Sequence, residues 1–133
     1  MNEQTLVLIK PDAVERNLIG KILSEYERND LKISDLKLLT ASKELAETHY
    51  AEHKGKPFYE NLVSYLTRSP IVALVLDGEN AVSRVRALNG TTNPEDSGDN
   101  TIRALYGVSL SENTVHSSDS IESADRERAI WFN

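Results

Sequence analysis

The side chains in this sequence best suited to nucleophilic or metal chemistry are three histidines. His116 lies at the end of a short predicted strand, directly before the polar residues 117–120 and the start of a predicted helix. The free N–H groups of a helix start favour anions, and a neutral imidazole beside an anion site can attack a phosphoryl group. A lone histidine in front of a helix cap more often has a structural role, so the residues alone favour that interpretation over a nucleophile.

The other two histidines, His49 and His53, are four residues apart on a predicted helix. That spacing can bind a metal, but no third ligand is evident and the glutamate of a zinc-protease motif is absent. We therefore interpret them as surface or packing histidines. The chain has no cysteine, which removes disulfides, thiol nucleophiles and thiolate zinc sites together.

The cations available for phosphate are scattered along the chain: Lys10 at a strand end, Arg86 in a helix and Arg103 in a loop. Arginine offers a planar fork to phosphate and lysine a point charge, although each alone is more often a solvated surface charge. No glycine-rich Walker loop is present. Phe58 near Leu62 suits base stacking, but at helical spacing an aromatic and a leucine more often belong to a core.

Length and composition predict one globular domain over residues 1–133. The sequence is 39% hydrophobic and 27% charged, has no apolar run long enough to span a membrane, and begins without a basic signal region. We therefore expect a cytoplasmic protein with no membrane partner. The net charge of −6 argues against a nucleic-acid binder. An anionic small ligand needs only a few cations that converge locally.

Hydrophobic patterns and turn residues predict the elements that would position these side chains. The predicted strands are residues 5–9, apolar on both faces and so central; 31–38, with a bulge near Ser34-Asp35; 71–76, ending at an Asp77-Gly78 turn; and 114–116. The predicted helices are residues 19–26, about 42–51 with Ser42 as the cap, 58–67, 79–88, and a last helix to about 131 opened by a capping box at Asp119-Ser120-Ile121-Glu122.

A long loop is predicted between about residues 91 and 112, with a short helix at its start, and a loop of this length usually serves a site. The order of elements predicts an α+β sandwich of the ferredoxin-like kind, a four-stranded antiparallel sheet. We expect the helices on one side of that sheet.

The segment Asn113-Thr114-Val115-His116-Ser117-Ser118-Asp119-Ser120-Ile121-Glu122-Ser123-Ala124 resembles the active-site signature of nucleoside diphosphate kinases. Three further blocks are similar to that family and lie in the same order: Ile9-Lys10-Pro11-Asp12, then His49-Tyr50 with Lys56-Pro57-Phe58-Tyr59, then Asn89-Gly90-Thr91-Thr92-Asn93-Pro94 with Thr101-Ile102-Arg103. Together they cover nearly the whole chain. The resemblance implies a ferredoxin-like sheet with helices packed around it.

The resemblance also implies an activity, a ping-pong reaction. A nucleoside triphosphate gives its γ-phosphate to Nδ1 of His116, and a nucleoside diphosphate then takes it, which maintains nucleotide pools. The cofactor implied is Mg²⁺, carried by the nucleotide phosphates and not bound directly by the protein. The partners implied are nucleotides and further copies of the chain, in a dimer-based tetramer or hexamer.

Residue roles follow from the matched positions. By resemblance, the phosphates would be held by Lys10, Arg86, Arg103 and Thr92, with Lys10 and Asn113 near the ribose; the base would stack on Phe58, with Leu62 alongside; and the nucleophile would be supported by Glu127, Ser118 and Tyr50.

The sequence departs from the family pattern in two places. Ser117 stands where glycine is usual, which would cost stability if that position needed a positive φ. The loop carries Asp99-Asn100 in place of Pro-Gly and lacks the usual acidic residue at Leu105.

Two other hypotheses remain beside the active kinase: a weakly catalytic binding module on the same fold, and an RNA-binding domain, which the acidic charge disfavours.

Overall fold

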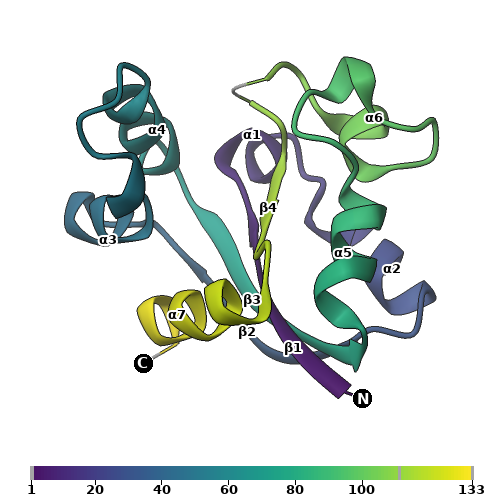
Figure 1. The fold of residues 1–133 in the computed structure, drawn as a ribbon. Coiled ribbons are helices and arrows are strands. Elements are labelled where there is room, and N and C mark those ends of the chain that lie inside the picture. The colour runs from purple at the N-terminus through teal and green to yellow at the C-terminus, as the bar shows by residue number, and fades with distance from the viewer. Residues whose placement is uncertain (1, 111, 133) are drawn as a thin grey trace.

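A four-stranded antiparallel sheet forms the centre of the computed structural model, which describes residues 2–110 and 112–132. The strands are β1 (Asn2–Ile9), β2 (Lys32–Leu39), β3 (Ile71–Glu79) and β4 (Val115–Ser117). Their order across the sheet is β2-β3-β1-β4, and each neighbouring pair is antiparallel. The predicted four-stranded sheet and the central position of the first strand are confirmed (Figure 1).

Helices cover both faces of the sheet, and not one side as the order of elements suggested (Figure 1). The α-helices are α1 (Pro11–Glu15), α2 (Ile19–Arg28), α3 (Lys43–His49), α4 (Tyr59–Leu66), α5 (Ala81–Asn89), α6 (Ile102–Tyr106) and α7 (Ile121–Trp131). Two short 3₁₀ turns are η1 (Ala51–His53) and η2 (Pro94–Asp96). Within the described residues, no helix is both long and apolar enough to cross a membrane.

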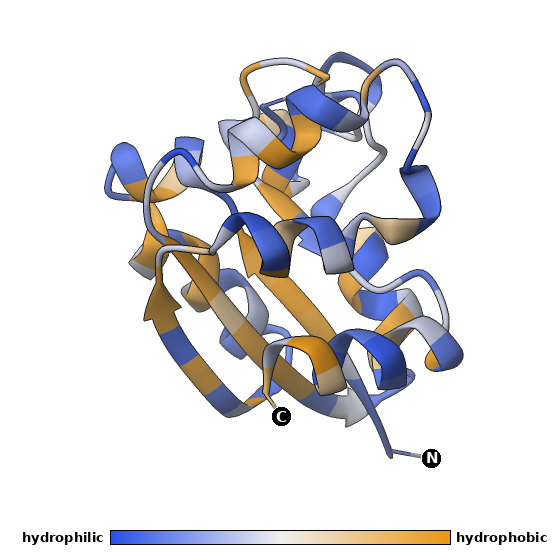
Figure 2. Cartoon of the chain, turned by 90° about the vertical axis from the view of Figure 1, so that its left-hand side faces the viewer, coloured by the Kyte–Doolittle hydropathy of each residue, from blue (hydrophilic) through white to orange (hydrophobic). Residues whose placement is uncertain are grey.

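The alternation of side chains along the strands explains why both faces are covered. Leu6 and Leu8 of β1 belong to a core with α3, α4 and α7, whereas Val7 and Ile9 belong to a core with α1, α2 and α5. Because successive side chains of a strand point to opposite faces, a strand that is apolar throughout must be buried on both. Figure 2 shows long hydrophobic stretches in the central strands, whereas the edge strand alternates between hydrophobic and hydrophilic residues.

Two local predictions are confirmed at the residue level. The register of β2 on β3 shifts between Ile33 and Asp35, which is the predicted bulge. The Ser42 side chain accepts a hydrogen bond from the backbone N–H of Leu45 at 3.1 Å and caps α3.

Three other boundaries differ from the prediction. β3 continues through Asp77 and Gly78, because these residues pair with Gln4 and Glu3 of β1, and α5 begins only at Ala81. Helix α7 is capped by Ser120, whose side chain accepts from Ser123 N, so the cap lies one residue after the predicted Asp119.

The predicted loop between residues 91 and 112 contains a helix that composition did not indicate. The Thr101 side chain accepts from Ala104 N and caps α6, and Ile102 is buried in the core beside the sheet. Tertiary burial of one apolar residue therefore outweighs the loop-like composition of the preceding residues.

Candidate active site

The side chain of His116 is bonded to a buried carboxylate. His116 lies on β4, and its Nε2 is 2.9 Å from Oε1 of Glu127 on α7. The hydroxyl of Ser118 donates to the same oxygen at 2.8 Å. An ionised carboxylate only accepts hydrogen bonds, so Nε2 of the neutral imidazole carries the hydrogen and Nδ1 keeps its lone pair.

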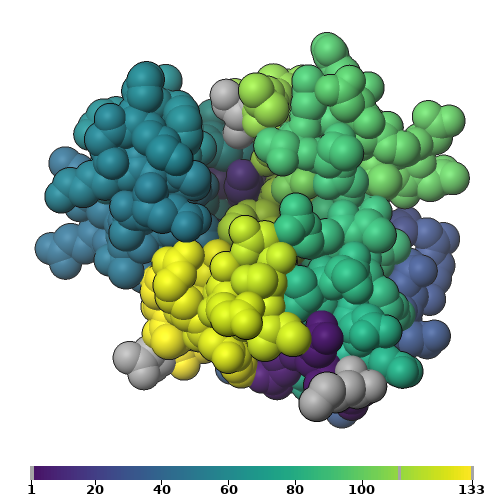
Figure 3. All heavy atoms as spheres, in the orientation of Figure 1, coloured from purple at the N-terminus to yellow at the C-terminus, as the bar shows by residue number. Residues whose placement is uncertain are grey.

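A cleft of about 340 Å³ opens beside this pair, and its lining carries all three cations predicted for phosphate. The predicted site residues on its wall are Lys10, Arg86, Thr92, Arg103, Asn113, His116 and Glu127. In the space-filling view a hollow lies between the α3–α4 region and the green and yellow segments, with atoms of the N-terminal part of the chain at its floor (Figure 3). Three cations and an imidazole around one cleft suit a polyphosphate.

Lys10 is buried at the point where β1 ends. Its Nζ donates a hydrogen bond to Oδ1 of Asn113 at 2.9 Å, and Asn113 Nδ2 donates to the backbone oxygen of Thr92 at 3.0 Å. Burial, followed by the nearby Arg103 guanidinium, lowers the pKa of Lys10 to about 8. The lysine, the amide and the threonine are therefore one connected group on the cleft wall.

The two arginines of the cleft are positioned by backbone carbonyls. Arg103 donates to the oxygens of Gly90 and Val115, each at 2.7 Å, and burial lowers its pKa. Arg86 on α5 donates to the backbone oxygen of Asp119 at 3.3 Å. Neither guanidinium forms a salt bridge with a carboxylate among the described residues, although Arg86 interacts electrostatically with the nearby Asp119. Both charges can therefore still bind an anionic ligand.

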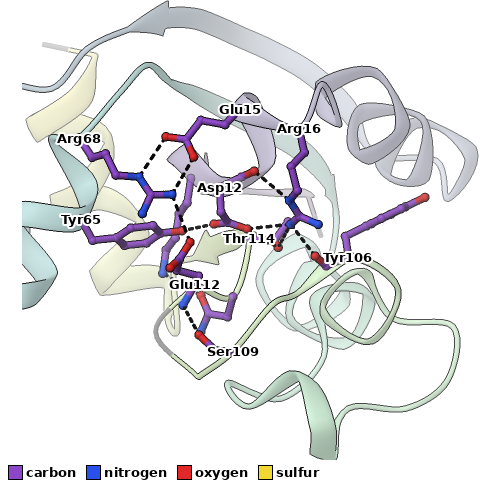
Figure 4. A network of polar contacts seen from close by, with 11 residues as sticks. Asp12, Glu15, Arg16, Tyr65, Arg68, Tyr106, Ser109, Glu112 and Thr114 are labelled. Atoms are coloured by element: carbon purple, nitrogen blue, oxygen red, sulfur yellow. Dashed lines mark hydrogen bonds and ion pairs between the residues drawn. The ribbon is translucent and has the colours of Figure 1, made fainter.

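A buried aspartate supports the turn that leads into β4 (Figure 4). Asp12 accepts hydrogen bonds from the hydroxyl of Tyr65 and, at 2.9 Å, from the hydroxyl of Thr114, and it pairs with Arg16 at 2.9 Å. Thr114 has a φ of 79°, a conformation that a β-branched residue rarely adopts. The positive φ thus falls at Thr114, and Ser117 lies in β4 without it.

His49 lies against the nucleophile candidate, although its spacing in the sequence did not indicate a site residue. It is buried at the end of α3, and its ring meets that of His116 edge-on, at a centroid distance of 4.6 Å and an interplanar angle of 83°. The predicted packing role of His49 is confirmed. The placement of His49 and His53 on one helix is wrong, because α3 ends at His49 and His53 lies in η1.

Of the described residues, His49, His116 and Glu127 form one group whose ligand atoms lie within 4.8 Å of one another. Glu127 is already bonded to His116, and Nδ1 of His49 accepts from the indole of Trp131 at 3.1 Å. Hydrogen bonds within the protein therefore account for this cluster. The cleft itself is lined by the cations Lys10, Arg86 and Arg103 and also by the carboxylates Glu52, Asp119 and Glu127.

Four predicted residues lie away from the cleft wall, and one of them is Ser118, which is buried beside Glu127. Phe58 is exposed just before α4, where its ring is 5.4 Å from that of His53, a residue that lines the cleft. Leu62 packs partly buried against the core of α3, α4 and α7. Tyr50 is buried with its ring 4.8 Å from that of His49, so it reaches the nucleophile through that histidine.

A sequence model of the nucleoside diphosphate kinase family matches residues 3–133. This chain belongs to the nucleoside diphosphate kinase family. The nucleoside diphosphate kinase of Clostridium perfringens is 56% identical over 130 residues, which cover 98% of this chain and 91% of the relative. That of Staphylococcus epidermidis is 51% identical over 130 residues, covering 98% and 87%.

Solved structures of nucleoside diphosphate kinases share the fold closely. The enzyme from Aquifex aeolicus superposes with a TM-score of 0.97 at 38% identity, over 100% of this chain and 96% of that one. The enzyme from Encephalitozoon cuniculi gives 0.95 at 38% identity, over 98% and 88%. The ferredoxin-like α+β fold and the family resemblance are thereby confirmed.

The nucleoside diphosphate kinase fold here also assembles residues that sequence reasoning did not select. Asp12, Tyr65, Thr114, His49 and Trp131 surround the predicted set without lining the cleft themselves. Asp12 lies inside the first of the family-like blocks, and that was the one signal available for it. No spacing in the sequence connects Trp131 with His49, because they are 82 positions apart.

Proposed function

We propose that the cleft carries out the family's two-step transfer on His116. Nucleoside diphosphate kinases exchange a γ-phosphate between nucleotides by a ping-pong mechanism through a phosphohistidine. The observation that carries the assignment to this residue is the bond from Nε2 of His116 to Glu127, which leaves Nδ1 as the nitrogen with a free lone pair.

In the proposed first step, the Nδ1 lone pair attacks the γ-phosphorus of a nucleoside triphosphate. The Nδ1–P bond forms while the bond between phosphorus and the β–γ bridging oxygen breaks, and the diphosphate leaves with that electron pair. The imidazole becomes cationic, and the carboxylate of Glu127 stabilises it through Nε2–H, with Ser118 holding the same oxygen. The second step reverses these changes onto another nucleoside diphosphate.

The substrate that fits this lining is the Mg²⁺ complex of the nucleotide. Lys10, Arg86 and Arg103 would neutralise phosphate oxygens, with the Thr92 hydroxyl as a further donor, and Asn113 lies beside Lys10 for the ribose. The family uses a divalent cation. The cleft carries Glu52, Asp119 and Glu127 as well as its three cations, but among the described residues these carboxylates do not gather into one group, so the lining suits a divalent cation that arrives on the phosphates better than one held by the protein. When bound, Mg²⁺ would supply positive charge that offsets the charge of the phosphates.

Base binding is assigned to Phe58, with Leu62 at its side. The exposed ring of Phe58 lies beside His53 at the edge of the cleft. Stacking uses the π-face that every base has, so this contact is expected to tolerate different bases.

We also propose that the chain is a homo-oligomer built on a dimer, as a tetramer or hexamer. The edge strand β2 supports this, because its outer side pairs with no other strand of the described sheet and it exposes Leu36 and Leu38. One domain over residues 1–133 and a cytoplasmic location are proposed on composition and on the nucleotide substrates.

The transfer is tested with γ-labelled ATP and Mg²⁺. The protein is expected to take up label that is acid-labile and base-stable, and to release it as labelled GTP when GDP is added. His116→Ala should take up none, while Ser109→Ala, on the surface loop, should label normally. Wild-type protein without label would refute the proposed activity, and label on His116→Ala would refute the nucleophile.

A further inference from the structure

A chain of aromatic contacts reaches the nucleophile from the C-terminal helix. The Trp131 indole N–H on α7 donates to Nδ1 of His49 at 3.1 Å, and both residues are buried. The ring of His49 in turn meets that of His116 edge-on at 4.6 Å. Three elements, α7, α3 and β4, therefore meet at the nucleophile through side chains that the proposed transfer does not itself use.

The Trp131 indole fixes the tautomer of His49. An indole N–H is only a donor, so Nδ1 of His49 is the acceptor and its hydrogen lies on Nε2 when the ring is neutral. Burial above all, followed by the neighbouring His116, lowers the pKa of His49 well below its usual value. A neutral ring does not add a second positive charge beside an imidazole that becomes cationic during transfer.

The hydrogen bond to Glu127 alone does not determine the plane of His116. The second side-chain torsion of histidine is broad, so the ring can swing about its bond to Cβ. His116 is 24% exposed in its side chain, which leaves room for that movement on the cleft side. A perpendicular ring packed against it removes this freedom, as the edge contact of His49 does.

We propose that His49, held by Trp131, is a positioning residue that fixes the ring plane of His116, with Nε2 on Glu127 and Nδ1 toward the cleft. The proposal rests on the proposed function, since it concerns the same nucleophile. It assigns to the C-terminal helix a part in phosphoryl transfer beyond supplying Glu127. A misaligned nucleophile slows the chemical step without changing how the nucleotide binds.

The test uses two variants and a matched control. Trp131→Phe removes the indole N–H and keeps an aromatic ring, whereas His49→Asn keeps an acceptor for Trp131 and removes the ring contact. The control is Tyr26→Phe, which removes another buried aromatic hydrogen bond, from the Tyr26 hydroxyl to Asn89 at 2.6 Å, on the opposite face of the sheet. Thermal melts first establish the temperature at which each protein is folded.

Two readouts separate positioning from stability. Single-turnover phosphorylation by MgATP should slow by about tenfold or more in both variants, with KM changed by less than about twofold, while Tyr26→Phe keeps the wild-type rate. Nitrogen NMR of ¹⁵N-histidine protein should show Nδ1 of His116 without hydrogen in the wild type, and a mixture of tautomers in the variants.

Several results would overturn the proposal. These are wild-type rates in both folded variants, a loss confined to KM, or an equal loss in Tyr26→Phe. If neither variant folds, the wild-type spectrum decides, because a hydrogen on Nδ1 of His116 contradicts the assigned arrangement. Failure of the proposed function is distinct, since the wild type itself would then take up no phosphate.

Discussion

At the scale of the residue, the site depends on charges held where water has little access. Lys10 is buried beside Arg103, and both its burial and that neighbour disfavour the ammonium form. The lysine is therefore a cation at neutral pH that lies close to losing its proton. Phosphate binding opposes that loss, because an anion nearby stabilises the charged form.

The pH dependence of the reaction follows from this pKa. Lys10 is protonated below about pH 8 and loses its positive charge as the pH rises through that value. We expect kcat/KM for the nucleoside triphosphate to fall above about pH 8, approaching tenfold for each further pH unit. Steady-state profiles from pH 6.5 to about 10 measure this, the upper limit lying near the ordinary lysine pKa.

Lys10→Gln is the control for that profile. This variant should be slower throughout, and its kcat/KM should not show the same decline. A decline that persists in Lys10→Gln would assign it to another group, and a flat wild-type profile would contradict the lowered pKa.

At the scale of the element, α1 and α4 hold the turn before β4 through Asp12. Asp12→Asn keeps the size of the side chain but weakens three interactions that involve a buried carboxylate. We expect it to lower the free energy of unfolding by about 2–3 kcal/mol, since hydrogen bonds to charged groups are worth about 1.5–3 kcal/mol each and an amide retains part of them. Chemical denaturation measures the change.

A matched control lies on the same helix. Glu15 pairs with Arg68 at 2.7 Å, but both side chains are well exposed. Glu15→Gln should therefore change the free energy of unfolding by less than about 1 kcal/mol. If the two variants lost equal stability, the network around Asp12 would have no special part in holding Thr114.

The elements also show how far the sequence alone could predict this structure. Local signals located the strands, the bulge near Ser34 and the cap at Ser42, because these depend on residues close in the chain. The extension of β3 through Gly78 depends on pairing with β1, and burial of Ile102 stabilises α6. Contacts between distant segments override local preference in such places.

The candidate site likewise contains residues that the sequence could assign and contacts that it could not. Resemblance to the family assigned Lys10, Arg103 and His116 to one site, and the cleft does gather them. The contact of His49 with His116 and Trp131 follows only from the packing of α3 against α7. Spacing along the chain associates His49 with His53, four residues away, whereas the fold packs the ring of His49 against that of His116.

At the scale of the whole molecule, the sheet ends in an edge strand that exposes two leucines. Leu36 is 45% exposed and Leu38 61%. Exposed apolar edge strands promote association unless they are covered, which supports a second copy of the chain at this surface. Leu38→Glu should weaken the dimer by at least about tenfold, since it places an unpaired charge in an apolar contact.

Sedimentation equilibrium measures that association. Ile121→Glu is the control, because Ile121 is 53% exposed but lies on α7 rather than on β2. It should leave the dimer unchanged. A monomeric wild type, or equal weakening by both substitutions, would contradict an interface through β2.

The most direct test of the proposed transfer is to identify the nitrogen that carries the phosphate. Protein labelled with ¹⁵N-histidine would be phosphorylated with MgATP and examined by NMR for coupling between phosphorus and the ring nitrogens. The geometry predicts phosphate on Nδ1 of His116 alone, because Nε2 is bonded to Glu127. Phosphate on Nε2 of His116, or on His49 or His53, would contradict it.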